Sequence, residues 1–184
     1  MTGNMDAKVS LLMEGYPRNG FTVFSNYLQK DQGVCITRLH PEYVVEKYGL
    51  KNARFHWLSG VKQEGTLSPK NVSILVKQVK GEIKDGQRKF FLDGLEYLLL
   101  WNDMNGIVAS LKEIEKELGD AGANMIVSID PLTFEEKDLR KLKESFPEMA
   151  KLSAGSPQNG VDEPADKGRI NADLLVSRGL TATP

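Results

Sequence analysis

Short apolar runs alternate along this chain with longer segments whose apolar residues recur every three or four positions. The short runs have the length of buried strands, and the longer segments have the period of amphipathic helices. Strands that alternate with helices are typical of βαβ units, in which consecutive strands run parallel and helices cover the sheet. The alternation therefore predicts an α/β fold: a three-layer parallel sheet of about five strands with helices on both faces.

The predicted strands and helices follow one another in a regular order. The strands are expected at residues 8–14, 34–38, 54–59, 89–93 and 124–130. The helices are expected near Gly20, from Pro41 to Gly49, from Ser68-Pro69 to about Ile83, over Ile107 to Gly119, and after a capping box formed by Thr133 and Glu136.

The composition changes after about residue 149. Residues 153–168 are rich in Ser, Gly, Pro, Asn and Asp and contain almost no large apolar residue, which is typical of a disordered segment. A chain of 184 residues fits one domain and a tail. We therefore predict a domain over residues 1–149 and a flexible tail over 150–184. Within the tail, residues 170–180 are compatible with a short docking helix or with an unstructured end.

Composition and charge exclude several classes of function. The formal net charge of −1 provides no broad basic field, which argues against nucleic-acid binding. The single cysteine, Cys35, excludes an intrachain disulfide and is expected to be a small buried strand residue. With only two histidines, a structural zinc site is not expected, and His56 inside a strand is expected to be packed and hydrogen-bonded. No secretory signal or membrane span is visible, so we expect a cytoplasmic protein without membrane contact.

The first predicted strand is followed by a loop with the spacing of a phosphate-binding loop. Such a loop reads G-x-x-x-x-G-K-[ST] between a strand and a helix. Here Gly15, Gly20 and Thr22 occupy the matching positions, but Phe21 replaces the lysine that would neutralise phosphate. The loss of such a charged contact costs about 1.5–3 kcal/mol, for which Arg18 inside the loop would compensate in part. A plain strand–turn–helix corner explains the same residues without a ligand.

The fourth predicted strand ends in Asp93, as does the strand whose aspartate holds Mg²⁺ in P-loop ATPases. Thr22 and Asp93 together would bind Mg²⁺ or a Mg-nucleotide only weakly, so no resident cofactor is expected. Asp93 and Glu96 also have the spacing of a helix cap, and this structural role is the preferred interpretation.

The order of these motifs resembles the RecA/KaiC branch of P-loop ATPases over residues 8–146. The loop from Met13 to Thr22, the strand 33–37, the strand 89–93 and the strand 125–130 carry the resemblance. Three further segments, 35–41, 57–59 and 92–98, resemble an archaeal family known as domain of unknown function 835. The ATPase resemblance implies a carboxylate after the second strand that activates water, whereas Arg38, Leu39 and His40 stand at those positions.

These losses predict a protein that does not hydrolyse ATP, and our first hypothesis is a non-catalytic regulatory or adaptor domain that acts in signalling through protein contacts. The helix at 69–83 and the tail are candidate contact surfaces. The alternative is a nucleotide or phosphoanion sensor that binds without hydrolysis. Its vestigial site would be formed by Gly15, Arg18, Gly20, Thr22, Arg38 and Asp93. In that site Arg38 and His40 would complete an anion pocket, but Arg38 pairing with a carboxylate and His40 capping a helix are the preferred interpretation. An enzyme with unrecognised chemistry is the third hypothesis.

Overall fold

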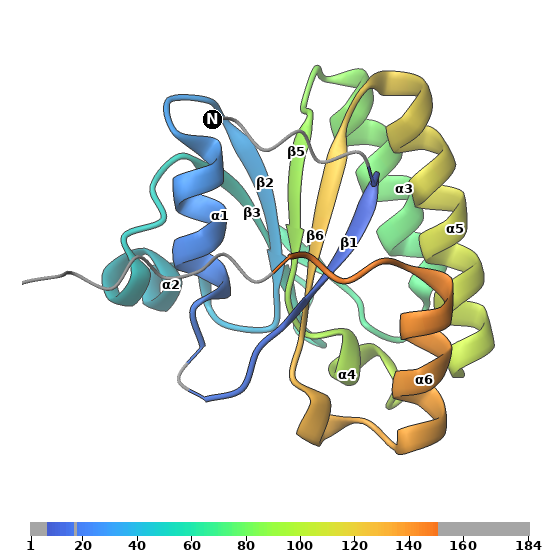
Figure 1. Cartoon of the computed structure of the whole chain (residues 1–184). Coiled ribbons are helices and arrows are strands. Elements are labelled where there is room, and N and C mark those ends of the chain that lie inside the picture. The colour runs from blue at the N-terminus through green and yellow to red at the C-terminus, as the bar shows by residue number, and fades with distance from the viewer. Residues whose placement is uncertain (1–6, 17, 151–184) are drawn as a thin grey trace, which may run out of the picture. The chain divides into compact units, whose positions relative to one another are not determined.

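A sheet of six parallel strands forms the centre of the molecule (Figure 1). The structure is a computed structural model and describes residues 7–16 and 18–150. The strands are β1 (Val9–Met13), β2 (Gly33–Thr37), β3 (Ala53–Leu58), β4 (Thr66–Leu67), β5 (Lys89–Leu92) and β6 (Asn124–Ile129). They lie in the order β1-β6-β5-β2-β3-β4, and every neighbouring pair is parallel.

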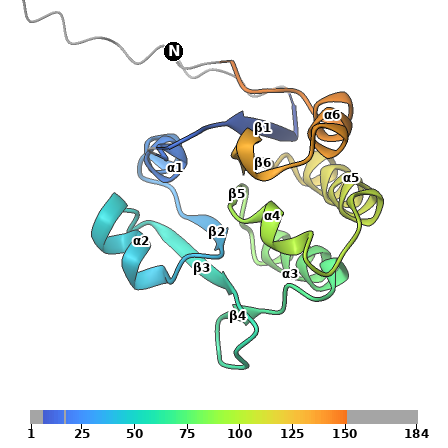
Figure 2. The same ribbon diagram turned by 90° about the horizontal axis from the view of Figure 1, so that it is seen from below.

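Helices cover both faces of the sheet, which gives the three-layer α/β fold that the sequence predicts. On one face lie α1 (Gly20–Leu28) and α2 (Pro41–Tyr48), as the view along the strands shows (Figure 2). On the other lie α3 (Val72–Lys84), α4 (Leu95–Leu98), α5 (Met104–Ala121) and α6 (Glu136–Ser145), with a short 3₁₀ turn at Pro131–Thr133. Among the described residues no helix is long and apolar enough to cross a bilayer.

Alternate residues of the central strands supply the two halves of the core. Val34 and Ile36 of β2 pack with the cluster under α3, α4 and α5, whereas Cys35 between them packs under α1 and α2. This division follows from the period of two in a strand. Because both faces are covered, every residue of β2 is buried, as expected for a continuous apolar run in a parallel sheet.

The sixth strand, β4, is one of the short elements that the sequence does not predict. β4 contains two residues, which pair with Trp57 and Leu58 at the end of β3. A segment this short has no measurable periodicity. The opposite edge of the sheet is covered as well, because residues 147–149 run beside β1, with hydrogen bonds from Leu11 N–H to Pro147 O and from Met149 N–H to Leu11 O.

Two predicted helix starts were wrong. α3 begins at Val72, not at Ser68-Pro69, because Asn71 caps it by accepting a hydrogen bond from the Ser73 N–H at 2.9 Å. α5 ends at Ala121, close to the end predicted near Gly119, and Gly122 follows in the left-handed conformation. The capping box of Thr133 and Glu136 is absent, since Thr133 lies in the 3₁₀ turn and Glu135 precedes α6. The predictions for the tail fall on residues 151–184, outside the described part of the chain.

Candidate functional site

The carboxyl ends of β2 and β5 meet where the direction of the chain across the sheet reverses. From β2 the chain proceeds to β3 through α2 on one face, and from β5 it proceeds to β6 through α4 and α5 on the other. In open parallel sheets, ligands bind in the crevice beyond such a reversal. Thr37 is the last residue of β2, and Asp93 follows β5 directly. This junction is therefore the place in the fold where a site is expected.

A network of charged side chains fills this junction. Asp93 is only 1% exposed. Its Oδ1 accepts a hydrogen bond from Arg18 Nη1 at 2.5 Å, and its Oδ2 accepts one from Thr37 Oγ1 at 2.9 Å. The Thr37 hydroxyl in turn accepts a bond from the backbone N–H of Leu39 at 3.0 Å. Both oxygens of the buried carboxylate are thus bound by groups of the same chain.

A second carboxylate, Glu96 of α4, lies between two arginines. Its Oε1 is 3.1 Å from Arg38 Nε and 3.7 Å from Arg18 Nη2. These are ion pairs, since neither contact has the alignment of a hydrogen bond to that oxygen. The side chain of Arg38 remains 41% exposed, whereas that of Arg18 is 14% exposed. Each arginine of the predicted site therefore has a carboxylate partner within the fold.

The pKa values of Asp93 and Arg18 are both raised, but for different reasons. Burial raises the pKa of the Asp93 carboxyl above its usual value, and the attraction of Arg18 and the Thr37 hydrogen bond offset only part of that rise. Burial alone would lower the pKa of Arg18, but the surrounding carboxylates, Asp93 first, outweigh it and the pKa is raised. Arg18 is thus a fixed cation against a carboxyl group that burial disfavours as an anion.

Glu14 occupies the amide groups at the start of α1. It follows β1, and its Oε2 accepts hydrogen bonds from the backbone N–H groups of Asn19 at 2.8 Å and Gly20 at 2.6 Å. Its Oε1 accepts a hydrogen bond from the Ser128 hydroxyl of β6 at 2.5 Å. A carboxylate is favourable at a helix N-terminus because free N–H groups and the helix dipole attract negative charge there. Within this loop an internal side chain supplies the anion.

Two neighbouring residues explain why the loop closes so tightly on Glu14. A Cβ on Gly20 would overlap the Glu14 carboxylate and the Phe91 ring, so this position requires glycine. Phe21 is buried, and its ring centroid lies 5.2 Å from that of Phe91. The residue at the expected lysine position is therefore a core side chain.

The structure brings together some of the six predicted site residues. Arg18, Arg38 and Asp93 share the network described above, and Gly20 lies beside Glu14. Gly15 is exposed, with no atom near its Cβ position, and Thr22 is exposed on α1 without a hydrogen bond to the network in the described part of the chain. Asp93 bonds to Arg18 and Thr37, and no hydrogen bond joins it to Thr22 within the described residues.

The preferred structural role of Asp93 was also wrong. The residue before α4 is Gly94, whose φ of 102° only glycine adopts readily, and Asp93 does not cap the helix with its side chain. His40 precedes α2 but likewise makes no side-chain cap; its ring packs edge-on against Trp57 at 4.9 Å. Arg38, the cation of the predicted anion pocket, pairs with Glu96 at 3.1 Å.

Sequence reasoning missed Glu14, Thr37 and Ser128. Glu14 was visible as a carboxylate directly before a loop that lacks its lysine, which is the place where a helix N-terminus favours an acid. Thr37 and Ser128 were visible only as polar residues near the ends of apolar strands. Their partners come from the sheet order, which one sequence does not reveal.

Most residues of this network lie in a segment that matches the model of a protein family. The model of the family described as "Protein of unknown function (DUF835)" matches residues 18–146. The chain belongs to this family. The DUF835 match includes Arg18, Thr37, Arg38, Asp93 and Glu96 and begins after Glu14. No curated protein matches the chain.

Proposed function

We propose that this DUF835 protein is a non-catalytic regulatory or adaptor domain, which retains the scaffold of a RecA/KaiC-like P-loop ATPase and acts in signalling through protein contacts. The observation that carries the proposal is Glu14, which accepts the two loop hydrogen bonds that a nucleotide phosphate would need. A tethered carboxylate acts at a high effective concentration, so a free anion competes with it poorly.

The cations of the loop region support the same proposal. Phosphate binding needs positive charge that is free to face the ligand. Arg18 is paired with Asp93 at 2.5 Å and Arg38 with Glu96 at 3.1 Å, and Phe21 replaces the lysine. A nucleotide would have to displace these internal partners before it gained any contact.

The position of the water-activating carboxylate supports the absence of hydrolysis. After β2 the chain offers Arg38, Leu39 and His40, none of which is a carboxylate. His40 lies 4.0 Å from Glu42 and packs on Trp57, and it makes no hydrogen bond to Asp93 within the described residues. Two functions that an ATPase needs, charge neutralisation and water activation, thus lack their residues.

Calorimetric titration with ATP and ADP, with and without Mg²⁺, tests this proposal. We expect no saturable heat and no thermal stabilisation of the wild type at millimolar nucleotide, and no released phosphate. Saturable binding that Gly20→Asp removes would instead favour the alternative hypothesis, a nucleotide or phosphoanion sensor. Turnover that requires a metal ion and disappears in Asp93→Asn would overturn both.

A Glu14→Ala variant identifies the cause of a negative result. This substitution frees the amides of Asn19 and Gly20 without changing the arginines. If inorganic phosphate or ADP stabilises Glu14→Ala but not the wild type, the internal carboxylate is what closes the loop. Circular dichroism of both proteins controls for loss of the fold.

A further inference from the structure

The large apolar side chains that are exposed to solvent all lie at one end of the sheet. Within the described residues they are Tyr16, Tyr43, Val61, Leu100, Trp101 and Leu132. Tyr16 follows β1, Tyr43 lies in the first turn of α2 after β2, and Val61 follows β3. Leu100 and Trp101 follow α4 after β5, and Leu132 follows β6. Because all strands are parallel, five separate connections place these side chains at the carboxyl edge.

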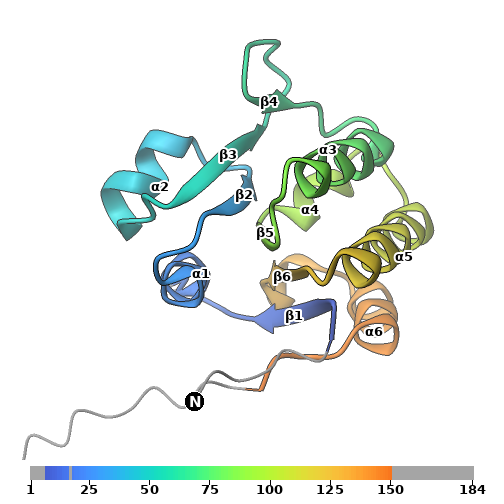
Figure 3. The same ribbon diagram turned by 90° about the horizontal axis from the view of Figure 1, so that it is seen from above.

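The amino edge, seen in Figure 3, has a different character. Its connections, residues 29–32, 49–52, 85–88 and 122–123, contain no exposed large apolar side chain. Single exposed apolar residues are ordinary on a protein surface, but their concentration on one face marks an interaction surface. Burial of the carboxyl edge against a partner would therefore remove more apolar surface from water than burial of the amino edge.

One side of the carboxyl edge protrudes and carries a cation. Tyr16 is 91% exposed at the start of the loop to α1. Lys47 donates a hydrogen bond to the Tyr43 hydroxyl at 2.7 Å and lies over the Tyr43 and Tyr48 rings. That hydrogen bond raises the pKa of Lys47. The rings of Phe21 on α1 and Tyr48 on α2 lie 4.7 Å apart, so the two helices of this side are in contact. No described carboxylate forms an ion pair with Lys47.

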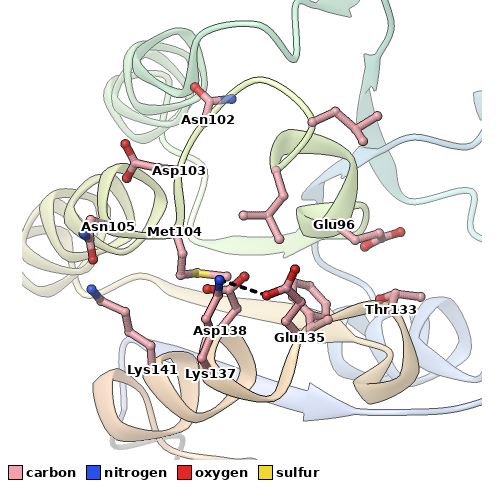
Figure 4. A pocket seen from close by; sticks show the side chains of 13 residues that line it. Glu96, Asn102, Asp103, Met104, Asn105, Thr133, Glu135, Lys137, Asp138 and Lys141 are labelled. Carbon is pink, nitrogen blue, oxygen red and sulfur yellow. Dashed lines mark ion pairs between the residues drawn. The ribbon is translucent and has the colours of Figure 1, made fainter.

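The other side of the carboxyl edge is recessed and carries carboxylates. A cleft of about 700 Å³ lies between α4, the start of α5 and α6 (Figure 4). Leu99, Met104 and Phe134 give it an apolar lining. At its rim, neither Asp103 nor Asp138 forms an ion pair within the described part of the chain, although Asp103 caps α5 by accepting the Gly106 N–H at 2.7 Å. One cation of the rim, Lys141, is likewise without an ion pair among the described residues. Leu132, which is 92% exposed, lies in the 3₁₀ turn that leads to α6.

We propose that the carboxyl edge binds a second copy of this chain, with the Tyr16–Tyr43–Lys47 side of each copy against the α4–α6 cleft of the other. The proposal rests on the proposed function, since it names the chain itself as a contact partner. Figure 2 views this edge directly and shows α1 and α2 on one side of the sheet and α4 and α6 on the other. A two-fold axis that lies in the plane of the interface lets each side of one copy meet the other side of its partner.

Complementarity within one edge favours a second copy over an unrelated partner. The protruding side has aromatic rings and an unpaired ammonium group, and the recessed side has an apolar lining and surplus carboxylates. In a two-fold interface each such contact occurs twice, so its contribution to the free energy of association counts twice. Tyrosine and tryptophan are also the side chains that most often anchor protein interfaces.

The available area fits a dimer of moderate affinity. At roughly 150 Å² for a large side chain, the exposed parts of the six apolar residues amount to roughly 600 Å² in each copy. A standard interface buries about 800 Å² per partner, so the polar rim must supply the remainder. We therefore expect a dimer whose population depends on protein concentration in the micromolar range.

Analytical ultracentrifugation of the full chain tests the proposal. The expected result is a monomer–dimer equilibrium that Leu100→Glu or Tyr16→Glu shifts toward the monomer by at least tenfold in dissociation constant. Gln32→Glu is the matched control, because it adds the same charge to an exposed residue at the amino edge and should leave the equilibrium unchanged. Circular dichroism and thermal unfolding of each variant separate loss of association from loss of fold.

Mixing two variants tests the geometry. Tyr16→Glu damages only the protruding side and Leu100→Glu only the recessed side. In a mixture one of the two contacts is intact, so heterodimers should form more readily than either homodimer. A wild type that stays monomeric up to about 500 µM, or dimers that both variants leave intact, would overturn the proposal. If the protein is monomeric and does not bind nucleotide, only this inference is overturned. If it dimerises and binds nucleotide, the proposed function is overturned instead.

Discussion

At the scale of single residues, Glu14 determines what the loop before α1 offers to a ligand. Phosphates and carboxylates use the same donors at a helix N-terminus. In this chain the donors are Asn19 and Gly20, and Glu14 accepts from both while its other oxygen accepts from Ser128. All three donors are thereby satisfied inside the fold. An anion from solution gains contacts here only by exposing Glu14 again.

The two loop glycines provide a matched test of this arrangement. A Cβ on Gly20 would overlap the carboxylate of Glu14 and the ring of Phe91, whereas nothing lies within 4 Å of a Cβ on Gly15. We expect Gly20→Ala to lower the free energy of unfolding by about 1–3 kcal/mol through overpacking and Gly15→Ala to change it by less than about 0.5 kcal/mol. Urea denaturation measures both values. Equal effects would show that Gly20 is not held against Glu14.

Asp93 provides a prediction about pH. Burial raises its pKa in the folded state above the usual value of 3.8, so the folded protein binds the proton more tightly than the unfolded chain. The ionised carboxylate therefore costs stability above the folded pKa, and this cost disappears as the pH falls to about 4. Asp93→Asn removes the titration. We expect the unfolding free energy of the wild type, minus that of Asp93→Asn, to decrease as pH rises from 4.

Urea denaturation at a series of pH values measures this difference, and groups that titrate alike in both proteins cancel. A difference that increases with pH would mean that Arg18 and Thr37 stabilise the carboxylate by more than burial costs. The slope of the difference thus identifies which effect dominates at the centre of the network.

At the scale of elements, the start of α3 depends on one capping residue. Asn71 accepts a hydrogen bond from the Ser73 N–H at 2.9 Å, whereas Ser68 lies outside the helix and accepts only a 3.4 Å bond from the Lys70 N–H. We expect Asn71→Ala to lower the free energy of unfolding by about 1 kcal/mol and Ser68→Ala to have a much smaller effect. Chemical denaturation of the two variants under identical conditions checks the ranking. If Ser68→Ala proved the more costly, the helix would begin earlier than α3 does here.

The elements that sequence reasoning predicted well are those with an internal pattern. β2 is a continuous apolar run, and α5 has apolar residues at helical spacing. The type of each element was therefore predictable from the sequence alone. β4 and α4 are too short to repeat any pattern. The network of Arg18 and Asp93 depends on which strands are neighbours, since 75 residues separate the two in sequence. Its members were identifiable by type and position, but their pairing required the sheet order.

A second buried network between elements shows the same limit. His56 of β3 was expected to be packed and hydrogen-bonded, and its Nε2 lies 2.7 Å from Oε1 of Glu82, which is buried on α3. The other oxygen of Glu82 accepts a hydrogen bond from Arg54 at 2.7 Å. A buried carboxylate needs such partners to offset its lost hydration. The helical spacing of α3 places Glu82 on the buried face with Leu75 and Val79, but its partners on β3 follow only from the fold.

At the scale of the whole molecule, Cys35 reports on whether the sheet opens as a unit. It lies on central strand β2, fully buried under α1 and α2, in contact with the core cluster that includes Phe24 and Phe91. Burial raises the pKa of its thiol well above the usual value, and the charge of Asp93 raises it further. The thiolate is the reactive form. Both inaccessibility and protonation therefore protect Cys35 in the folded state.

We expect a disulfide reagent to label Cys35 at neutral pH on the order of 10³-fold or more slowly than the unfolded chain, because labelling requires opening with a free energy near that of global unfolding. The labelling rate should rise with urea in parallel with the unfolding constant obtained from circular dichroism. A Cys35→Ala/Gln32→Cys variant, whose thiol lies at an exposed position, controls for the reagent. Rapid labelling of Cys35 in protein with native circular dichroism would show that α1 and α2 separate from the sheet while the other layer stays folded. In that case the layer that carries Tyr16 and Lys47 would be an independent unit, and the contacts of Glu14 and Arg18 would be too weak to hold it on the sheet.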